Sequence, residues 1–397
     1  MQRPERGWWS ACAAVARREA AWLRASPWDL AMLSAIPLAV CALVAWIFSA
    51  GVVRDLPLVV IDQDHSALSR QITRYLEASP GLRVQAQVQR WDEAMALLRE
   101  RQAFGVLLLP AHLEREVVEG RAVTLPWFTN GQFQAHVGGL SRDVRSVVGT
   151  VSGGIELAAR GKRGAAPVQA RAQFEPVRLK LATLYNEATS YEAFLTLALM
   201  PAVLQIFIAL AAVSAVGREL KAGSVPDWLA TAGGRWGAAL LGKLLWSALA
   251  FALLAAAVVV WFGAVRGWAL AGGAAALALG WLLLILAYLA IGTLLVAVTL
   301  ALRNAISLAA FVTAPAFAFA GQGFPLMAMP PLAKAWAGAL PLTHFLQIQS
   351  RHWLAGAPNA YSGPELAWLA GATLVCGAAA WGLLRARALR PSAWGRR

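Results

Sequence analysis

Six runs of about 20 mostly apolar residues constrain this chain more than any other feature, because a helix of that length crosses the hydrocarbon core of a bilayer. The six runs are Leu30 to Val53, Phe194 to Val216, Leu244 to Phe262, a stretch within Trp268 to Leu302, Ile306 to Phe324, and Leu366 to Leu384. The chain is 59% hydrophobic and 14% charged, which exceeds what a soluble core requires. The sequence therefore predicts an α-helical integral membrane protein with six transmembrane helices.

The distribution of basic residues predicts the orientation of these helices. Fifteen Arg and Lys residues lie near the termini and in alternate loops, whereas the remaining short loops hold three, Arg266, Lys334 and Arg351. Lys and Arg are retained on the cytoplasmic side. We therefore expect a multi-pass membrane protein with both termini cytoplasmic and residues 385–397 forming a basic tail. Because the net charge of +14 comes from these flanking residues, we expect the lipid bilayer, and no nucleic acid, as a partner.

Residues 54–190, between the first two apolar runs, have a mixed composition that predicts a folded domain. Apolar and alternating stretches predict strands, and amphipathic stretches predict helices, in β-α-β-α-β order. The expected strands are Leu56–Ile61, Arg83–Val88, Phe104–Leu109 and Ala122–Phe128; the expected helices are Ser66–Ala78, Asp92–Arg101, Leu113–Glu119 and Gln132–Arg160; Val168–Leu179 should return as an extended segment. This order favours a parallel or mixed sheet covered by helices. We expect an extracytoplasmic α/β domain inserted between transmembrane helices 1 and 2.

The segments that flank this domain complete the expected organisation. Residues 1–28 alternate apolar residues with Arg and Glu at helical spacing, which predicts a cytoplasmic interfacial amphipathic helix; the alternative is a disordered basic tail. Transmembrane helix 1 should occupy residues 29–53, and its apolar run is longer than that of a secretion signal, so we expect it to be retained. Residues 191–384 should hold transmembrane helices 2–6.

One stretch nearly matches a nucleotide-binding motif. Gly237 to Lys243 fits the first seven positions of the phosphate-binding loop, but Leu244 stands where a Ser or Thr must bind magnesium. The stretch also enters an apolar run instead of following a buried strand. We therefore expect no bound cofactor and no catalytic residue in this chain, so any ATP and Mg²⁺ would be bound by a partner chain.

Metal-binding and disulfide sites are not expected in the extracytoplasmic domain either. His65, His112 and His136 lie too far apart to show metal-ligand spacing, and residues 54–190 contain no Cys. The acidic stretch Asp62-Gln63-Asp64 follows an expected strand. Its simplest interpretation is a turn in which Asp64 or Ser66 caps the next helix.

The link between the second and third apolar runs, residues 217–236, contains a short helix signal. Ser224-Val225-Pro226-Asp227 has a capping-box pattern with proline near the helix start, and Gly233-Gly234 supplies a stop. Trp228 and Leu229 should project from a helix of about two turns that has no core of its own. Exposed apolar side chains of this kind indicate a docking surface for a partner. The alternative is that both side chains rest among lipid headgroups.

Several of these residues resemble the ABC-2 family of export permeases. The coupling link of that family is similar to Arg218-Glu219, Gly223-Ser224, Leu229, Thr231 and Gly242-Lys243, although Pro226 and Ala232 depart from the pattern. The start of the outer domain resembles Val59 to Ser69, the re-entry into the membrane resembles Tyr185-Asn186 with Tyr191 and Phe194, and the stretch after the fifth span resembles Gly323-Phe324-Pro325, Met329-Pro330 and Pro341 to Phe345. Met200-Pro201 replaces a Pro-Gly pair.

The resemblance implies a transmembrane permease subunit that moves an amphipathic or hydrophobic substrate, such as a drug, lipid or envelope component, out of the cytoplasm. Two chains, identical or paralogous, would pack over a dimer of separate ABC ATPase subunits, and it is open whether a periplasmic adaptor joins them. The residues expected to couple to the ATPase are Glu219, Gly223, Ser224, Trp228, Leu229, Thr231, Gly242 and Lys243.

Residues 315–331 are the expected re-entrant part of the translocation path. Six Pro and Gly residues would break a continuous helix there, and irregular backbone persists at membrane depth only inside protein or beside a wet cavity. The alternative is a span that ends at Gly321 and continues as a loop. The candidate residues of the path and its outer gate are Gln205, Thr293, Gln322, Phe324 and Pro325.

Two other function classes fit the sequence less well. A membrane-anchored receptor or assembly scaffold would use the outer domain for binding and would not need Trp228 or Leu229. An ion-coupled transporter is disfavoured because the central parts of the six runs contain no Asp or Glu. The substrate itself has no short sequence motif.

Overall fold

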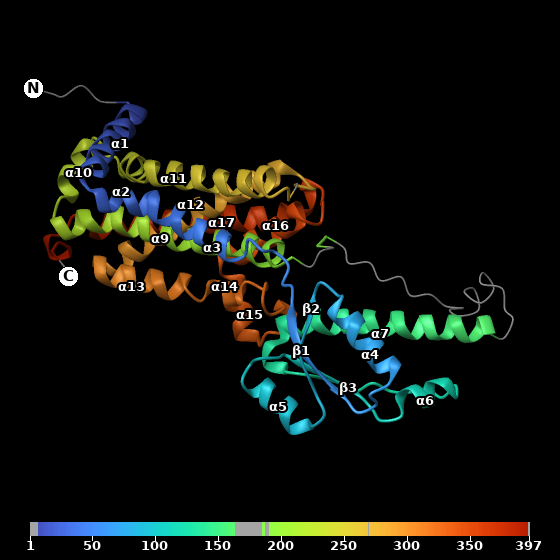
Figure 1. The fold of residues 1–397 in the computed structure, drawn as a ribbon. Coiled ribbons are helices and arrows are strands. Elements are labelled where there is room, and N and C mark those ends of the chain that lie inside the picture. Colours follow the sequence, from blue (N-terminus) through green and yellow to red (C-terminus); the bar gives the residue numbers. More distant parts are fainter. Residues whose placement is uncertain (1–6, 163–184, 187–189, 269, 396–397) are drawn as a thin grey trace, which may run out of the picture. The chain divides into compact units, whose positions relative to one another are not determined.

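The computed structural model describes residues 7–162, 185–186, 190–268 and 270–395. The chain forms two compact units, which we call the membrane unit (Met1–Gly51 with Thr183–Arg397) and the sheet unit (Val52–Ala182). Each is described separately (Figure 1). The extended segment expected at Val168–Leu179 lies outside the described residues.

The membrane unit has six described helices that are long and apolar enough to cross a membrane, as the sequence predicts. They are Pro27–Ile47, Glu192–Ala222, Trp236–Val265, Ala274–Thr299, Leu302–Phe319 and Asn359–Arg387. The second and fourth are the most buried, with 61% and 56% of their apolar windows inside the unit, against 11–22% for the others. The bundle is therefore built around these two helices, and the other four present most of their apolar surface outward.

The helical elements of the membrane unit run along the chain in the order given next, and the sheet unit separates α3 from η2 in sequence (Figure 1). They are α1 (Trp8–Ala25), α2 (Pro27–Leu33), α3 (Ala35–Ile47), η2 (Glu192–Thr196), α9 (Leu197–Ala222), α10 (Val225–Thr231), α11 (Trp236–Val260), η3 (Trp261–Val265), α12 (Ala274–Thr299), α13 (Leu302–Thr313), α14 (Ala316–Phe319), η4 (Leu326–Ala328), α15 (Pro331–Gly338), α16 (Pro341–Trp353), η5 (Asn359–Ser362), α17 (Gly363–Arg387) and η6 (Pro391–Ala393). Figure 1 places α1, α10 and the C-terminal end at the same end of the unit.

Two sequence features explain how the first span is built. Ser26-Pro27 ends α1, because a proline cannot continue the helix that precedes it, and the Ser26 hydroxyl accepts from Asp29 N at the start of α2. Pro37 then interrupts the span at Ser34, because it has no N–H for the Leu33 carbonyl four residues earlier. The amphipathic segment expected at the N-terminus is thus a separate helix, α1.

The two most buried helices pack very closely. A Cβ added at Gly292 of α12 would lie 2.5 Å from Ala209 O of α9, so only a glycine permits this approach. Small residues allow helix backbones to come together where lipid provides no hydrophobic driving force. Gly292 therefore fixes the contact at the centre of the bundle.

The expected irregular stretch at residues 315–331 is a broken helix in the structure. After α13 the chain forms the four-residue α14, bends through Gly321 at φ +83°, and forms the single 3₁₀ turn η4 before α15 begins at Pro331. The prolines and glycines have the expected effect on the backbone.

The sheet unit contains a four-stranded mixed sheet with helices. Its order is β2 (Leu82–Val88), β1 (Leu56–Asp62), β3 (Gly105–Leu109), β4 (Trp127–Thr129), the first three strands being parallel and β4 antiparallel to β3. The helices are α4 (Ala67–Glu77), α5 (Trp91–Arg99), α6 (Leu113–Val118), η1 (Gly131–Phe133) and α7 (Gln134–Lys162). Seven of these elements agree with the expected ones to within a few residues. The last strand is much shorter than Ala122–Phe128, because Pro126 cannot donate to a ladder.

The acidic turn after β1 is structural. Asp62 Oδ1 accepts from the N–H groups of Asp64 and His65 at 3.0 Å, and Ser66 caps α4 by accepting from Ser69 N. Asp64 does not cap α4; its Oδ2 accepts from Glu114 N, 3.0 Å away at the start of α6. Burial alone would raise the pKa of Asp64, but hydrogen bonds to its carboxylate from the Ser66 hydroxyl and from backbone N–H groups of residues 112–114 outweigh this effect and hold the pKa below its ordinary value.

Replacement of Gly105 by alanine should destabilise the sheet unit. The new Cβ would meet the Trp127 ring at 2.2 Å, and the ring is held by a 3.0 Å hydrogen bond from Trp127 Nε1 to Ser141. We expect a loss of about 1–3 kcal/mol, measured by limited proteolysis of the purified full chain in urea. Gly149→Ala in α7 is the matched control, because nothing lies within 4 Å of its new Cβ. Equal resistance of the two variants would contradict the packing described here.

Candidate functional site

The short helix α10 is formed as its sequence indicates. Gly223 ends α9 at φ +67°, and the Gly223 and Ser224 N–H groups donate to Leu220 O (3.2 Å) and Glu219 O (2.9 Å). This left-handed position is the one that glycine adopts after a helix end. At the other end of α10, Gly233 and Gly234 have φ +62° and +79° and turn the chain into α11.

Trp228 is buried, which corrects the expectation that it projects from α10. Its side chain is 1% exposed, and its Nε1 donates to Ala239 O at 3.3 Å. The ring packs edge-on against Trp236 of α11, with centroids 5.9 Å apart. The physical reason is that α11 starts five residues after α10 and offers an apolar face. Leu229 is half-buried, so Trp228 anchors α10 instead of forming its outer surface.

Ser224 also differs from the expected capping residue. It occupies the N-cap position of α10, but its hydroxyl makes no capping bond and instead donates to Glu219 Oε2. Thr231 Oγ1 donates to Asp227 O within the same helix at 2.8 Å. Of the coupling residues predicted from the sequence, Glu219, Ser224, Trp228 and Lys243 come together, whereas the Thr231 hydroxyl bonds within α10.

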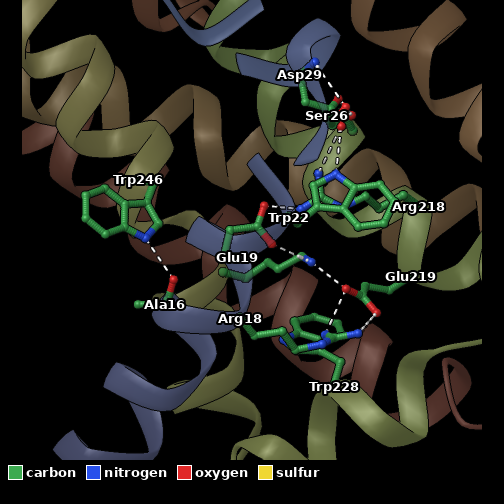
Figure 2. Close-up of polar contacts among 12 residues, drawn as sticks. Ala16, Arg18, Glu19, Trp22, Ser26, Asp29, Arg218, Glu219, Trp228 and Trp246 are labelled. Carbon is green, nitrogen blue, oxygen red and sulfur yellow. Dashed lines mark hydrogen bonds and ion pairs between the residues drawn. The ribbon is translucent and has the colours of Figure 1, made fainter. Parts of the chain in front are cut away.

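The centre of the site is a buried ammonium group between two carboxylates. Lys243 of α11, 2% exposed, lies 2.7 Å from Glu19 Oε2 of α1 and is also paired with Glu219 of α9. Its Nζ lies 5.8 Å from the centre of the Trp228 ring. Glu219 further accepts a bidentate pair of 2.9 Å hydrogen bonds from Arg18 of α1 (Figure 2). Lys243 thus links α1, α9 and α11 at a point where its ammonium group also lies beside the Trp228 ring of α10.

A second cation extends the cluster toward α2. Arg218 of α9 pairs with Glu19, lies 3.7 Å from Asp29 Oδ2, and stacks over Trp22 with 4.9 Å to the ring centre (Figure 2). Asp29 accepts from Trp22 Nε1 at 2.7 Å and from Ser214 at 3.2 Å. We call the six charged residues Arg18, Glu19, Asp29, Arg218, Glu219 and Lys243 the ion-pair cluster. It has three carboxylates and three cations, so its formal charge is zero.

The second half of the near-match to a phosphate loop belongs to this cluster. Gly242 and Lys243 lie inside the continuous helix α11, and a Cβ at Gly242 would come within 2.5 Å of Cys12 O in α1. The glycine therefore permits the crossing of α1 over α11, and Trp246 Nε1 donates to Ala16 O at 2.8 Å beside it. The stretch binds a helix where a phosphate loop would bind a nucleotide.

Sequence reasoning missed Glu19, Arg18 and Asp29. The buried face of α1 comprises Ala11, Cys12, Val15, Ala16, Glu19 and Leu23. An acid within an otherwise apolar helical stripe is a signal, because a buried carboxylate needs a partner. Charged residues are also typical of a helix that lies in the membrane interface, so the sequence pattern alone does not single out Glu19.

The candidate path residues do not form one site. Gln205 is buried and donates to Thr313 O of α13 at 3.1 Å, and Gln322 donates to Phe194 O at 2.8 Å. Thr293 bonds its own helix at Leu289 O and borders an apolar cavity of about 410 Å³ between α11, α12 and α17. Phe324 and Pro325 are exposed. Gln205 and Gln322 therefore bond to backbone carbonyls of other helical elements, and Thr293 bonds to a carbonyl of its own helix.

Four acids lie in the described spans, because these helices extend beyond their apolar centres. Glu219 and Asp29 belong to the ion-pair cluster, Glu192 pairs with Arg266 at 2.6 Å, and Glu365 pairs with Arg351 at 2.7 Å. All four stand near helix ends. The C-terminal segment is also not a free tail, since Gly395 N donates to Leu220 O at 3.2 Å and Trp394 packs beside Gly223.

Comparison with known families matches the chain to a family model described as "ABC-2 family transporter protein" over residues 27–381. This chain belongs to the ABC-2 transporter family. The resemblance noted in the sequence is thereby confirmed, and the chain is the permease of an ABC transporter, a multi-pass membrane subunit that works with a partner ATPase. A comparison with curated protein sequences gave no match.

Removal of the central cation should destabilise the permease strongly. Lys243→Met leaves Glu19 and Glu219 with one partner fewer in a buried setting, and we expect a loss of about 3–5 kcal/mol. Thermal unfolding of the purified permease in detergent measures this loss of stability. Lys221→Met, the same exchange at an exposed position on α9, should lie within about 0.5 kcal/mol of the parent.

A double variant separates charge from packing at this position. Adding Glu219→Gln to Lys243→Met removes one of the uncompensated carboxylates, so it should restore part of the lost stability. Additive losses would show that Lys243 and Glu219 are not energetically coupled, which would contradict the ion pair as the source of stability.

Proposed function

We propose that this permease is the transmembrane subunit of an ABC exporter that moves an amphipathic or hydrophobic substrate out of the cytoplasm. The observation that carries the proposal is the attachment of α10 to the ion-pair cluster. Ser224 bonds Glu219, and Trp228 lies over Lys243, so α10 is tied to α1, α9 and α11 at once. A partner that pushes on α10 would therefore move three helices together.

The docking surface we propose is the face of α10 that remains exposed. Pro226, Asp227 and Ala230 point away from the bundle, and Gly233-Gly234 continues the same surface. This face is small and close to the backbone, which suits insertion into a groove of the ATPase. The ATPase would bind ATP and Mg²⁺ and carry out hydrolysis, while this chain contributes no catalytic group.

The proposed assembly has two permease chains, identical or paralogous, over two ATPase subunits in the inner membrane. Both termini and α10 would face the cytoplasm, and the sheet unit would form the extracytoplasmic domain that a periplasmic adaptor could contact. The broken helix at residues 315–331 would then lie at the outer mouth, with Phe324 and Pro325 at the gate. The excess of Arg and Lys near α1, α10 and the C-terminus supports this orientation.

Bulk on the exposed face of α10 should uncouple the ATPase. Ala230→Trp places a large ring on the proposed docking surface, and we expect at least tenfold weaker binding of the cognate ABC ATPase, about 1.4 kcal/mol, with loss of permease-dependent ATP hydrolysis. Ala335→Trp on the exposed face of α15 is the matched control. If the parent permease neither bound the ATPase nor changed its hydrolysis rate, the proposal would be wrong and the scaffold alternative would gain support.

The proposed orientation is tested by cysteine labelling. In a variant without the three native cysteines, Gln89→Cys in the sheet unit should react with an impermeant maleimide from outside intact inner-membrane spheroplasts. Ala230→Cys should react only after the membrane is permeabilised. The reverse pattern would place α10 outside and exclude the proposed docking.

A further inference from the structure

A cavity of about 250 Å³ lies beside the ion-pair cluster. Its walls come from α1, α2, α9, α11 and α13. One side is apolar, with Met32, Leu33, Phe207 and Leu210, and the other side carries Glu19, Asp29, Ser214 and Arg218. The cavity is therefore amphipathic, and no residue of the proposed docking surface on α10 lines it.

The mouth of the cavity is open at the surface of the membrane unit. Trp28 and Ile306, which border it, are 68% and 43% exposed. Trp28 begins the first span and Ile306 lies near the start of the fifth. A tryptophan at the end of a span stands at the level of the headgroups, so a molecule could enter the cavity from the bilayer with its polar end at this level.

The polar wall favours a cation. The lining contains two carboxylates and one guanidinium, and the Glu19 carboxylate is already shared by Arg218 and Lys243. Of the two carboxylates in the lining, Asp29 has the less compensated charge. Its side chain accepts hydrogen bonds from the neutral groups of Trp22 and Ser214, and the guanidinium of Arg218 is 3.7 Å away. Its side chain is 19% exposed. A second positive charge near Asp29 would be attracted, and Trp28 offers an aromatic face for it.

From this geometry we propose that the cavity binds an amphipathic amine. The ammonium group pairs with Asp29 beside Trp28, and the apolar chain lies against Met32, Leu33, Phe207 and Leu210. A phospholipid fits less well, since its phosphate would stand next to two carboxylates. The idea that such amines are the cargo rests on the proposed function, and the cavity shares Glu19 and Arg218 with the cluster under α10, so a bound amine is placed to influence coupling.

Photolabelling of the permease alone tests the site. The probe is dodecylamine with a diazirine on its alkyl chain, added to the full chain in phosphatidylcholine nanodiscs, with labelled peptides identified by mass spectrometry. We expect labelling within residues 28–33 and 207–214. Dodecylamine should compete at least tenfold better than dodecanol, after correction for partition into empty nanodiscs, and dodecanoate should compete least. This ratio corresponds to one charge-assisted hydrogen bond to a partly buried carboxylate.

Two variants make the test specific. Asp29→Asn should bring the amine and the alcohol to within about threefold of each other, because the charge is removed while an acceptor for Trp22 and Ser214 remains. Ala211→Trp should abolish labelling of both segments, because the new ring fills the cavity. This variant tests the site independently if Asp29→Asn does not fold. Asp227→Asn, at an exposed acid on α10, should keep the full preference for the amine.

Several outcomes would overturn the proposal. Equal competition by dodecanol would mean an ordinary lipid site, and stronger competition by dodecanoate would mean an anion site. Labelling that persists in Ala211→Trp would place the probe elsewhere, and labelling absent from the parent chain would mean that the cavity does not take up the amine. Since the ATPase takes no part, failure here leaves the proposed coupling intact, and failure of coupling leaves a selective amine site intact.

Discussion

Lys243 sets the constraint on which the rest of the membrane unit depends. An ammonium group that is 2% exposed has to be compensated, and here the compensation comes from two carboxylates on two other helices. Each of those carboxylates has a second cation, Arg218 or Arg18. Separating α1, α9 or α11 would leave a buried charge without a partner. The ion pairs therefore hold α1, α9 and α11 together as one rigid group. Apolar packing alone would allow these helices to slide past one another.

This body explains why α10 can be so short. A helix of seven residues has little stability of its own, and here it is held by Trp228 against α11 and by the Gly223-Ser224 link to Glu219. Because Trp228 is buried, it is not available as an apolar contact for a partner protein. Its burial instead fixes the orientation of α10 on the ion-pair cluster. A rigidly attached small helix transmits a displacement better than one that rests in lipid headgroups. This attachment suits the coupling that we propose, in which the ATPase would contact the few exposed positions of α10.

The sequence allows the parts of this structure that depend on local pattern to be predicted. The six spans follow from apolar length, α10 follows from the Ser-x-Pro-Asp and Gly-Gly signals, and the mixed sheet follows from alternating stretches. Trp228 could not be placed, because its burial depends on which face of α11 lies beside α10. The ion-pair cluster could not be assembled either, since Glu19 and Lys243 are far apart in sequence and only a crossing permitted by Gly242 brings them together.

A second charged contact stands at the opposite end of α9. Glu192 in the π-helical turn η2 pairs with Arg266 after η3, accepts from Trp268 Nε1 at 3.2 Å, and Arg266 also donates to Ser49 O at the end of the first span. At this end an ion pair therefore joins the second and third spans, and a hydrogen bond from Arg266 adds the end of the first. In the described residues no ion pair joins these spans to α12 or α13. The contact of α9 with α12 therefore depends on close packing at Gly292 and not on paired charges.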